Sequence, residues 1–557
     1  MTYPSIQQYQ EALQHPATAF TDPVLATGKI AVSGLGVPRV LSGGFALTYA
    51  VEVGGRKYAA RCFHREAKGL ERRYEAISKK LKSLASPYFL DFEYQPKGVR
   101  IGGSAFPVVK MAWANGETLG EFVENNHGNV AKVKNLLTSL GQLASYLEQT
   151  GIAHGDIQDL NLVVTDDGRK IQLIDYDGMF VPELASLGGS ELGHRDYQHP
   201  QRDAKKYDST LDRFSFIALN LALRALCEKP SLWRTSQSGA GVIVFRANDY
   251  ADPGSSAVVA EVAAIPALAR DAKNFEAICG AEFGVVPTLA HFATGSNIPR
   301  AVAQLKPRST TVTRAAAPVG YISAYPVLNA TDYAAFEKGI GQMVELIGKV
   351  VEVKVDRTRG GKPYIFVNFG HWRGNTVKIN VWNEALSKGG EHPSEVWVGR
   401  WVTMRGLVEP VYANKKFNYQ HISITANAVT QISQLTEAEA KYRLSAPRTP
   451  ITRGATSSVA SNNSAVLDLL RGSSPTATPP MASGGQHHPT HSSASRNQSI
   501  LQSMKGSTSS TRPAPPQRSA ANSSTRGAAP SPSPFKQHTP TKQTPSGLLG
   551  WLAGLFK

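Results

Sequence analysis

Two short stretches of the chain carry oxygen-bearing side chains at a spacing suited to phosphate chemistry. HGDIQDLN at 154–161 contains His154, Asp156 and Asn161 in the pattern HxDxxxxN, and IQLIDYDG at 171–178 reads as a strand that ends in Asp175. Carboxylate and amide oxygens are the hard ligands that Mg²⁺ prefers, and phosphoryl transfer depends mainly on positioning and charge neutralisation. The pattern predicts Asp156 as the proton acceptor for a hydroxyl, with Asn161 and Asp175 as metal ligands.

Each of these residues, taken singly, also fits a simpler structural role. Asp156 and Asn161 suit a turn or a cap, and Asp175 suits a strand end. Arg61 fits a solvent-facing strand position, and His154 is expected to hold its loop rather than act as acid or base. The joint spacing of the two stretches favours the chemical interpretation over this structural one.

The elements around these stretches predict a small β lobe followed by a larger helical lobe. From about 30 to 115 short β-branched or aromatic runs alternate with Gly, Pro or charged turns. One stretch, 69–85, instead places its apolar residues at spacings of three and four, which predicts a helix. From 117 onward helical patterns dominate.

Several further motifs in this order resemble a group of bacterial protein-kinase-like proteins over residues 25–300. GGFALTYAV at 43–51 is similar to their glycine-rich loop, KYAARCF at 57–63 to the strand with the phosphate-binding Lys, and VVKMAWANGETL at 108–119 to their hinge. The segment IDYDGMFVPELASLGGSELGHRDYQHPQR at 174–202 resembles that group most closely.

The resemblance implies a bilobal fold, with an N-lobe at about 30–115 and a C-lobe at about 116–300, that uses ATP and Mg²⁺. Asp156 would be the catalytic residue, and Asn161 and Asp175 would hold the metal. The expected ATP contacts are Gly43, Gly44, Arg61, Glu75, Met111, Ala112 and Ala114, with Glu75 as the partner of Arg61 and Glu71, one turn earlier, as the alternative. The implied activity is transfer of the γ-phosphate to Ser/Thr of a protein substrate.

Departures from the pattern leave two alternatives open. Leu41 and Ala46 replace loop glycines, and Arg61 replaces Lys with a bulkier planar group. These changes suit a catalytically weak pseudokinase that acts as a nucleotide-dependent binding or scaffold module. HGD is also typical of small-molecule phosphotransferases, although the His-containing segment 183–210, in which four Lys/Arg nearly balance five Asp/Glu, is not the strongly acidic insertion of such enzymes and favours a protein substrate over a small one.

After a linker at 301–325, residues 338–435 contain about five strand-like runs, which predict a small OB-type β-barrel. A generic β-sandwich would show a similar pattern. OB barrels commonly hold single-stranded nucleic acid by aromatic stacking and basic charge. The candidates here lie in polar, basic loops and are Trp372, Arg373, Lys415, Lys416 and Phe417. A protein-docking barrel is the alternative.

Residues 445–557 are rich in Ser, Thr and Pro and predict a disordered tail. The tail holds 11 Lys/Arg against one acid, Asp468, and so carries much of the formal charge of +17. SNNSAVLDLLRGS at 461–473 and SRNQSILQSMKGS at 495–507 align as a repeated motif, which predicts binding of a protein partner. The terminal GLLGWLAGLFK is too short to span a bilayer and suits a partner groove or a membrane surface.

The remaining composition predicts an α+β, cytoplasmic protein with reduced thiols. Cys62, Cys227 and Cys279 lie far apart and without metal-like spacing to His. No basic flank precedes an apolar core at the N-terminus, and no 18 apolar residues run together. We therefore expect neither secretion nor a transmembrane segment.

Overall fold

The computed structural model describes residues 3–33, 36–43, 46–65, 69–236, 241–300, 320–388, 390–414 and 418–445. Helices and strands are mixed in these residues, as the predicted α+β class requires. The tail from 446, with both repeats and the terminal apolar segment, lies outside the described residues, as do Gly44, Lys415, Lys416, Phe417 and residues 301–319 of the linker.

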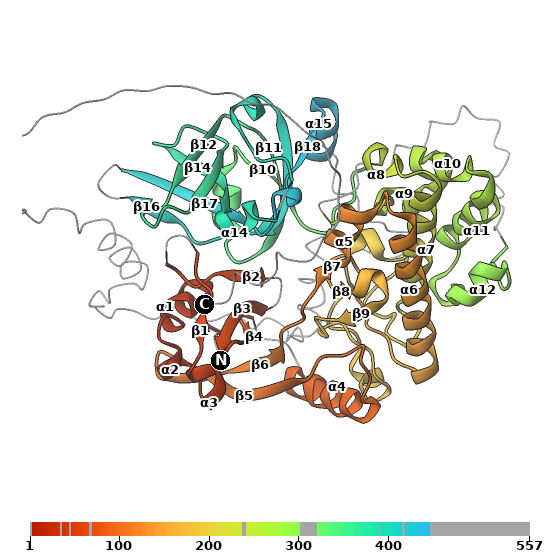
Figure 1. The fold of residues 1–557 in the computed structure, drawn as a ribbon, viewed down its shortest axis with the longest axis horizontal. Coiled ribbons are helices and arrows are strands. Elements are labelled where there is room, and N and C mark those ends of the chain that lie inside the picture. Colours follow the sequence, from red (N-terminus) through yellow and green to blue (C-terminus); the bar gives the residue numbers. More distant parts are fainter. Residues whose placement is uncertain are drawn as a thin grey trace, which may run out of the picture. The chain divides into compact units, whose positions relative to one another are not determined.

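A six-stranded sheet forms the first part of the fold (Figure 1). Its path is β1-β3-β4-β6-β5, with β2 beside β3, and every pairing is antiparallel. A two-residue turn at Gly54 and Gly55, both with positive φ, joins β3 to β4 as the twist of a tight hairpin requires. The strands are β1 (Lys29–Ile30), β2 (Val40–Gly43), β3 (Ala46–Val53), β4 (Arg56–Phe63), β5 (Phe92–Ile101) and β6 (Ser104–Ala112).

Side chains alternate across this sheet, so each face packs on a different group of helices. Leu47, Tyr49 and Val51 of β3 share a core with three short N-terminal helices, α1 (Ile6–Ala12), α2 (Pro16–Ala19) and α3 (Pro23–Ala26). Phe63 belongs instead to the core that includes α4 (Leu70–Leu84). Residues 3–26 are thus an integral part of this unit.

The next part is mainly helical and contains a small three-stranded sheet, β7-β8-β9. The long helices α6 and α7 run side by side in Figure 1 and bury much of its core. The sheet strands are β7 (Glu117–Thr118), β8 (Leu162–Thr165) and β9 (Lys170–Leu173). The helices are α5 (Leu119–Asn126), α6 (Val130–Thr150), α7 (Arg213–Glu228), α8 (Leu232–Thr235), α9 (Ala247–Ala251), α10 (Ala257–Ala263), α11 (Ala269–Gly280) and α12 (Leu289–Thr294).

Residues 327–445 form two sheets around a separate core. One has the order β10-β11-β15-β18 and the other β12-β13-β14-β17-β16, in which β14 and β17 are parallel. The strands are β10 (Val327–Asn329), β11 (Met343–Lys349), β12 (Glu352–Arg357), β13 (Pro363–Asn368), β14 (Asn375–Trp382), β15 (Trp401–Leu407), β16 (Tyr412–Asn414), β17 (Tyr419–Ala426) and β18 (Ser433–Leu435). The helices are α13 (Tyr333–Lys338), α14 (Asn383–Leu386) and α15 (Glu437–Ser445).

The predicted OB-type barrel is not established by this arrangement. Strands β15 and β17 belong to different sheets, although the Glu409 N–H donates to the Ser423 carbonyl between them (2.9 Å). Within the described residues the strands are arranged as two sheets and not as one closed barrel. The region also extends past its predicted bounds of 338–435, because β10 and α15 pack onto it.

Candidate active site

Arg61 on β4 forms a buried ion-pair cluster with two carboxylates. Its Nη1 lies 2.6 Å from Asp175 Oδ1 and its Nη2 lies 2.6 Å from Asp177 Oδ2. The Tyr74 hydroxyl of α4 donates to the other oxygen of Asp177. Burial raises the pKa of Asp177, and the guanidinium of Arg61 opposes that rise. One planar group thus bridges two acidic residues from the same loop, which an ammonium would do less well.

The expected pairing of Arg61 with Glu75 is wrong for this structure. Helix α4 buries Leu70, Tyr74, Ile77 and Leu81 toward the sheet, so the position after Tyr74 is turned away and Glu75 is exposed. The residue that reaches the Arg61 cluster from this helix is Tyr74. The apolar spacing predicted the helix correctly, and the same spacing places Tyr74 rather than Glu75 on the inward face.

The loop before Asp156 is fixed by Asp212 at the start of α7. The two oxygens of Asp212 accept hydrogen bonds from the backbone N–H groups of His154 (2.5 Å) and Gly155 (2.8 Å). His154 is fully buried, and its Nε2 contacts the carbonyl oxygen of Ile174 at 3.0 Å. This contact links the loop to the residue before Asp175, so the two stretches singled out in the sequence lie together.

Only glycine fits at position 155. Gly155 has a φ of +80°, and a Cβ there would lie 2.2 Å from the Gly178 carbonyl oxygen. That backbone contact cannot yield as a flexible side chain would. The Gly of HGD therefore serves the close approach of the two loops.

Asp156 is held by three donors. Its Oδ1 accepts the backbone N–H of His194 at 2.7 Å, and its Oδ2 accepts the side-chain amides of Asn161 at 2.9 Å and Gln158. Burial raises the pKa of Asp156, and the His194 bond opposes this. A carboxylate offers about four lone-pair sites, so room remains for one further donor. A raised pKa suits a carboxylate that accepts a proton.

Asn161 and Asp175 offer oxygen atoms of the type that Mg²⁺ takes. Because the Asn161 amide nitrogen bonds to Asp156, its oxygen is the atom left for another contact. Asp175 has a φ of 65°, unusual for a residue with a Cβ, and its side chain is 34% exposed. The described residues contain no group of three or more His, Cys, Asp or Glu that could hold a metal ion by itself. A magnesium bound here would be completed by phosphate or water oxygens, which is its usual mode.

The predicted nucleotide contacts are distributed along the sheet. Gly43 ends β2, and Met111 of β6 is buried in the core. The Ala112 N–H donates to the Asp91 carbonyl (3.0 Å) and is therefore already engaged, and Ala114 lies just past the end of β6.

A second ionic cluster joins β15 to the segment around His194, whose backbone N–H donates to Asp156. Arg405 Nη2 lies 2.8 Å from Asp196 Oδ2, and Arg405 Nη1 lies 3.2 Å from His194 Nε2. Asp196 also accepts the Ala247 N–H (2.9 Å). Burial and Arg405 together lower the pKa of His194 to about 4, so its ring is neutral at neutral pH. Sequence reasoning missed this pair because its members are 209 residues apart.

Trp372 and Arg373 lie together in the loop between β13 and β14. The Arg373 guanidinium sits 4.7 Å from the centre of the Trp372 ring, and Tyr419 meets that ring edge-on at 5.8 Å. Trp372 is partly buried and Arg373 is exposed.

Comparisons with known proteins leave the family undefined. No family model matches the sequence, and no curated protein matches it. Among solved structures, the protein is similar to the Cydia pomonella granulovirus kinase PK-1, with 15% sequence identity and a TM-score of 0.27, over 36% of this chain and 72% of that one. None of the helices in the described ranges combines the length and apolar character needed to cross a membrane.

Proposed function

We propose that residues 25–300 form a protein-kinase-like unit that binds ATP with Mg²⁺ and transfers the γ-phosphate to Ser/Thr of a protein substrate. The observation that carries the proposal is the convergence of Asp156, Asn161 and Asp175. The first two share a 2.9 Å hydrogen bond, and the N–H of Ile174, the residue before Asp175, donates to the Asn161 carbonyl (3.0 Å), which supports a common site for the three. Among the described residues, Arg61 is the only cation in the ion-pair cluster that includes Asp175 and Asp177.

Each of these residues then has a role set by its surroundings. Asp156, with its raised pKa, accepts the proton of the attacking hydroxyl and orients it. Asn161 and Asp175 hold the magnesium, which neutralises phosphate charge when it is bound. Arg61 holds the Asp175 side chain in place, and the buried Asp212 fixes the loop so that Asp156 is preorganised.

Transfer of radiolabel from ATP to a generic protein substrate tests this proposal. Asp156→Ala and Asp175→Ala should each abolish label transfer, and Arg169→Gln, which alters an exposed side chain, should leave it unchanged. Melting curves of all four proteins show whether the variants fold. Transfer that survives both Asp substitutions would rule out this assignment.

A nucleotide-dependent binding module is the second candidate. It is favoured because the carboxylates of the site already have hydrogen-bond or ion-pair partners within the protein. Three donors cover Asp156, and Arg61 already occupies one oxygen of Asp175. A protein of this kind would bind ATP without turning it over. ATP binding in the absence of any label transfer by the wild type would select this candidate.

We also propose that the β region of residues 327–445 is OB-like and binds single-stranded nucleic acid. The parallel pairing of β14 with β17 and the cation-over-ring contact at Trp372 support this proposal. Retention on single-stranded DNA or RNA should fade steeply with salt. Trp372→Ala should weaken it by about 1–3 kcal/mol, the usual value of one stacked base, while Arg169→Gln should not. Salt-insensitive retention would contradict nucleic-acid binding.

A further inference from the structure

Residues 193–202 lie directly against the loop that carries Asp156. A Cβ at Gly193 would lie 2.8 Å from the Gly155 carbonyl oxygen and 2.9 Å from Asp156 Oδ1, so the two segments are closely packed at this point. Gly193 has a φ of +71°, which a residue without a Cβ adopts readily. The placement of residues 193–202 therefore bears directly on the loop.

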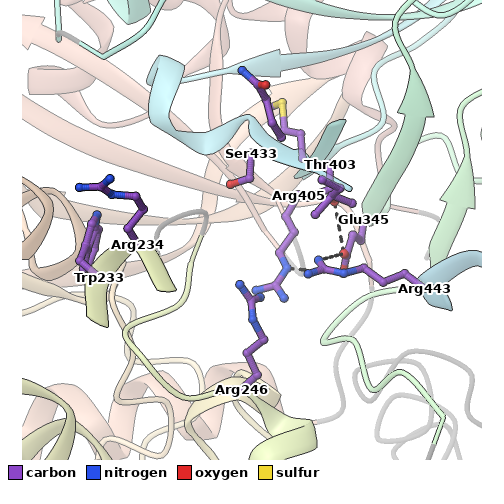
Figure 2. A pocket seen from close by; sticks show the side chains of 11 residues that line it. Trp233, Arg234, Arg246, Glu345, Thr403, Arg405, Ser433 and Arg443 are labelled. Carbon is purple, nitrogen blue, oxygen red and sulfur yellow. Dashed lines mark hydrogen bonds and ion pairs between the residues drawn. The ribbon is translucent and has the colours of Figure 1, made fainter. Parts of the chain in front are cut away.

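A contact from β15 anchors this segment independently of the loop. Arg405 Nη2 lies 2.8 Å from Asp196 Oδ2. Figure 2 shows Arg405 with Glu345 and Arg443 beside it, and Arg443 Nη1 lies 3.2 Å from Glu345 Oε1. Because these three residues belong to β15, β11 and α15, the segment should stay anchored when one of its contacts to the loop is lost.

Arg202 joins the anchored segment to the loop. It is only 5% exposed, and its Nη1 donates to the Gly155 carbonyl at 2.7 Å and to Gln198 Oε1. Burial lowers the pKa of Arg202 to about 10, and the carboxylates of Asp212 and Asp156 oppose that fall, so the guanidinium is a cation at neutral pH. A charged donor therefore holds the carbonyl of the peptide that leads into Asp156.

Gly155 is thus held by charged groups at both its N–H and its carbonyl. Asp212 accepts the Gly155 N–H at 2.8 Å, and Arg202 donates to the Gly155 carbonyl. Hydrogen bonds that involve an ionised group are roughly twice as strong as neutral ones. Glycine has more backbone freedom than any other residue, so these two bonds fix the point at which the loop would otherwise turn most easily. The orientation of the next residue, Asp156, depends on them.

We propose that Arg202 is a positioning residue for Asp156, which it orients by holding the Gly155 carbonyl. This inference rests on the proposed transfer of phosphate, because the orientation of Asp156 affects a rate only if that carboxylate accepts the hydroxyl proton. Arg202 does not contact the substrate in this role. Gln198 is 3% exposed and accepts a bond from the same Arg202 nitrogen, so it keeps that donor directed at the loop.

Hydrogen exchange of the full chain, followed by mass spectrometry, tests the positioning without requiring activity. Peptides over 154–161 report the N–H groups of His154 and Gly155, which are bonded to Asp212. In Arg202→Met these groups should exchange about tenfold faster or more, the effect of one lost charge-assisted hydrogen bond, while peptides from α10 should not change. Arg224→Gln, which breaks a 2.6 Å ion pair with Asp271, is the matched control and should leave 154–161 unchanged.

Radiolabel transfer then tests the consequence for the reaction. Arg202→Met should lower kcat by up to about a hundredfold, the usual effect of a misplaced reacting group, and leave the KM for ATP unchanged. Arg202→Lys should restore part of kcat and part of the slow exchange, because a single nitrogen of Arg202 makes both bonds and an ammonium keeps the charge. If Arg202→Met does not fold, Gln198→Met removes the acceptor beside the guanidinium and should produce the same local change at smaller size.

The two readouts separate this inference from the proposed function. Faster exchange at 154–161 together with no label transfer by the wild type would uphold the hold of Arg202 on the loop and refute the transfer of phosphate. Exchange at 154–161 that stays unchanged in the Arg202 variants, or that rises equally in α10, would overturn the inference. An unchanged kcat of Arg202→Met beside an active wild type would overturn it as well.

Discussion

Removal of the Arg61 guanidinium should expose how much the stability of the candidate site depends on charge. In Arg61→Gln, Asp177 loses a 2.6 Å ion pair while its side chain is only 5% exposed. Asp175 loses an equally short contact but is 34% exposed, so water compensates it in part. Removing one partner of a buried pair typically costs about 3–5 kcal/mol, and most of that loss should come from Asp177.

The cost should depend on pH in a definite direction. Burial already raises the pKa of Asp177, and Arg61 is the main influence that lowers it. Without Arg61 the carboxyl gains a proton more readily, and the protonated form carries no buried charge. The variant should therefore lose less stability at pH 5 than at pH 8, because at the lower pH proton uptake replaces the lost cation.

Urea unfolding followed by tryptophan fluorescence at both pH values measures this difference. Asp177→Asn provides the matched comparison, since it removes the buried charge, and Arg61→Gln/Asp177→Asn should cost less than the sum of the two single changes. Arg169→Gln should cost less than about 0.5 kcal/mol at either pH, as an exposed substitution. A cost for Arg61→Gln below about 1 kcal/mol at pH 8, or one that is the same at both pH values, would refute the reasoning.

Three further substitutions probe the fold around the site. Burial raises the pKa of Asp159 to about 7, so the stability that this group contributes is present below its unfolded pKa of about 4 and is lost as the pH rises through about 7. Asp159→Asn should therefore lose less stability than the wild type between pH 5 and pH 9, as measured by urea unfolding at both pH values. Arg405→Gln should cost about 3–5 kcal/mol of unfolding free energy, and combining it with Asp196→Asn should cost less than the sum of the singles; additive costs would contradict a direct pair. Gly155→Ala should lower the melting temperature by several degrees in scanning calorimetry, because its Cβ would meet the Gly178 carbonyl; an unchanged melting temperature would contradict that contact.

Local patterns predicted the elements well where burial is one-sided. The apolar spacing in 69–85 matches α4, and the β-branched runs from 30 to 115 match the strands of the six-stranded sheet. The same apolar spacing also shows why Glu75 does not pair with Arg61, because the buried face of α4 includes Tyr74 and not Glu75. Asp177, two positions after Asp175 in the same motif, also forms an ion pair with Arg61, a role that the motif alone does not indicate.

Contacts between distant stretches could not be predicted in the same way. Arg405 and Asp196 are separated by 209 residues, and the residues around each give no local signal that they meet. The barrel prediction had a related weakness, because strand-like runs give a strand count but do not show which edges pair. The structure divides these strands between two sheets, so an OB-type arrangement stays a proposal.

The central claim is that Asp156, Asn161 and Asp175 together form a site for ATP with Mg²⁺. Melting of the full chain with and without ATP and MgCl₂ tests this claim directly, since a ligand at 100 times its dissociation constant stabilises the folded state by about 2.7 kcal/mol. We expect ATP to raise the melting temperature only when magnesium is present, and Asp175→Asn to abolish the rise while Arg169→Gln preserves it. A melting temperature that nucleotide leaves unchanged, or a rise of equal size in Asp175→Asn, would contradict the account.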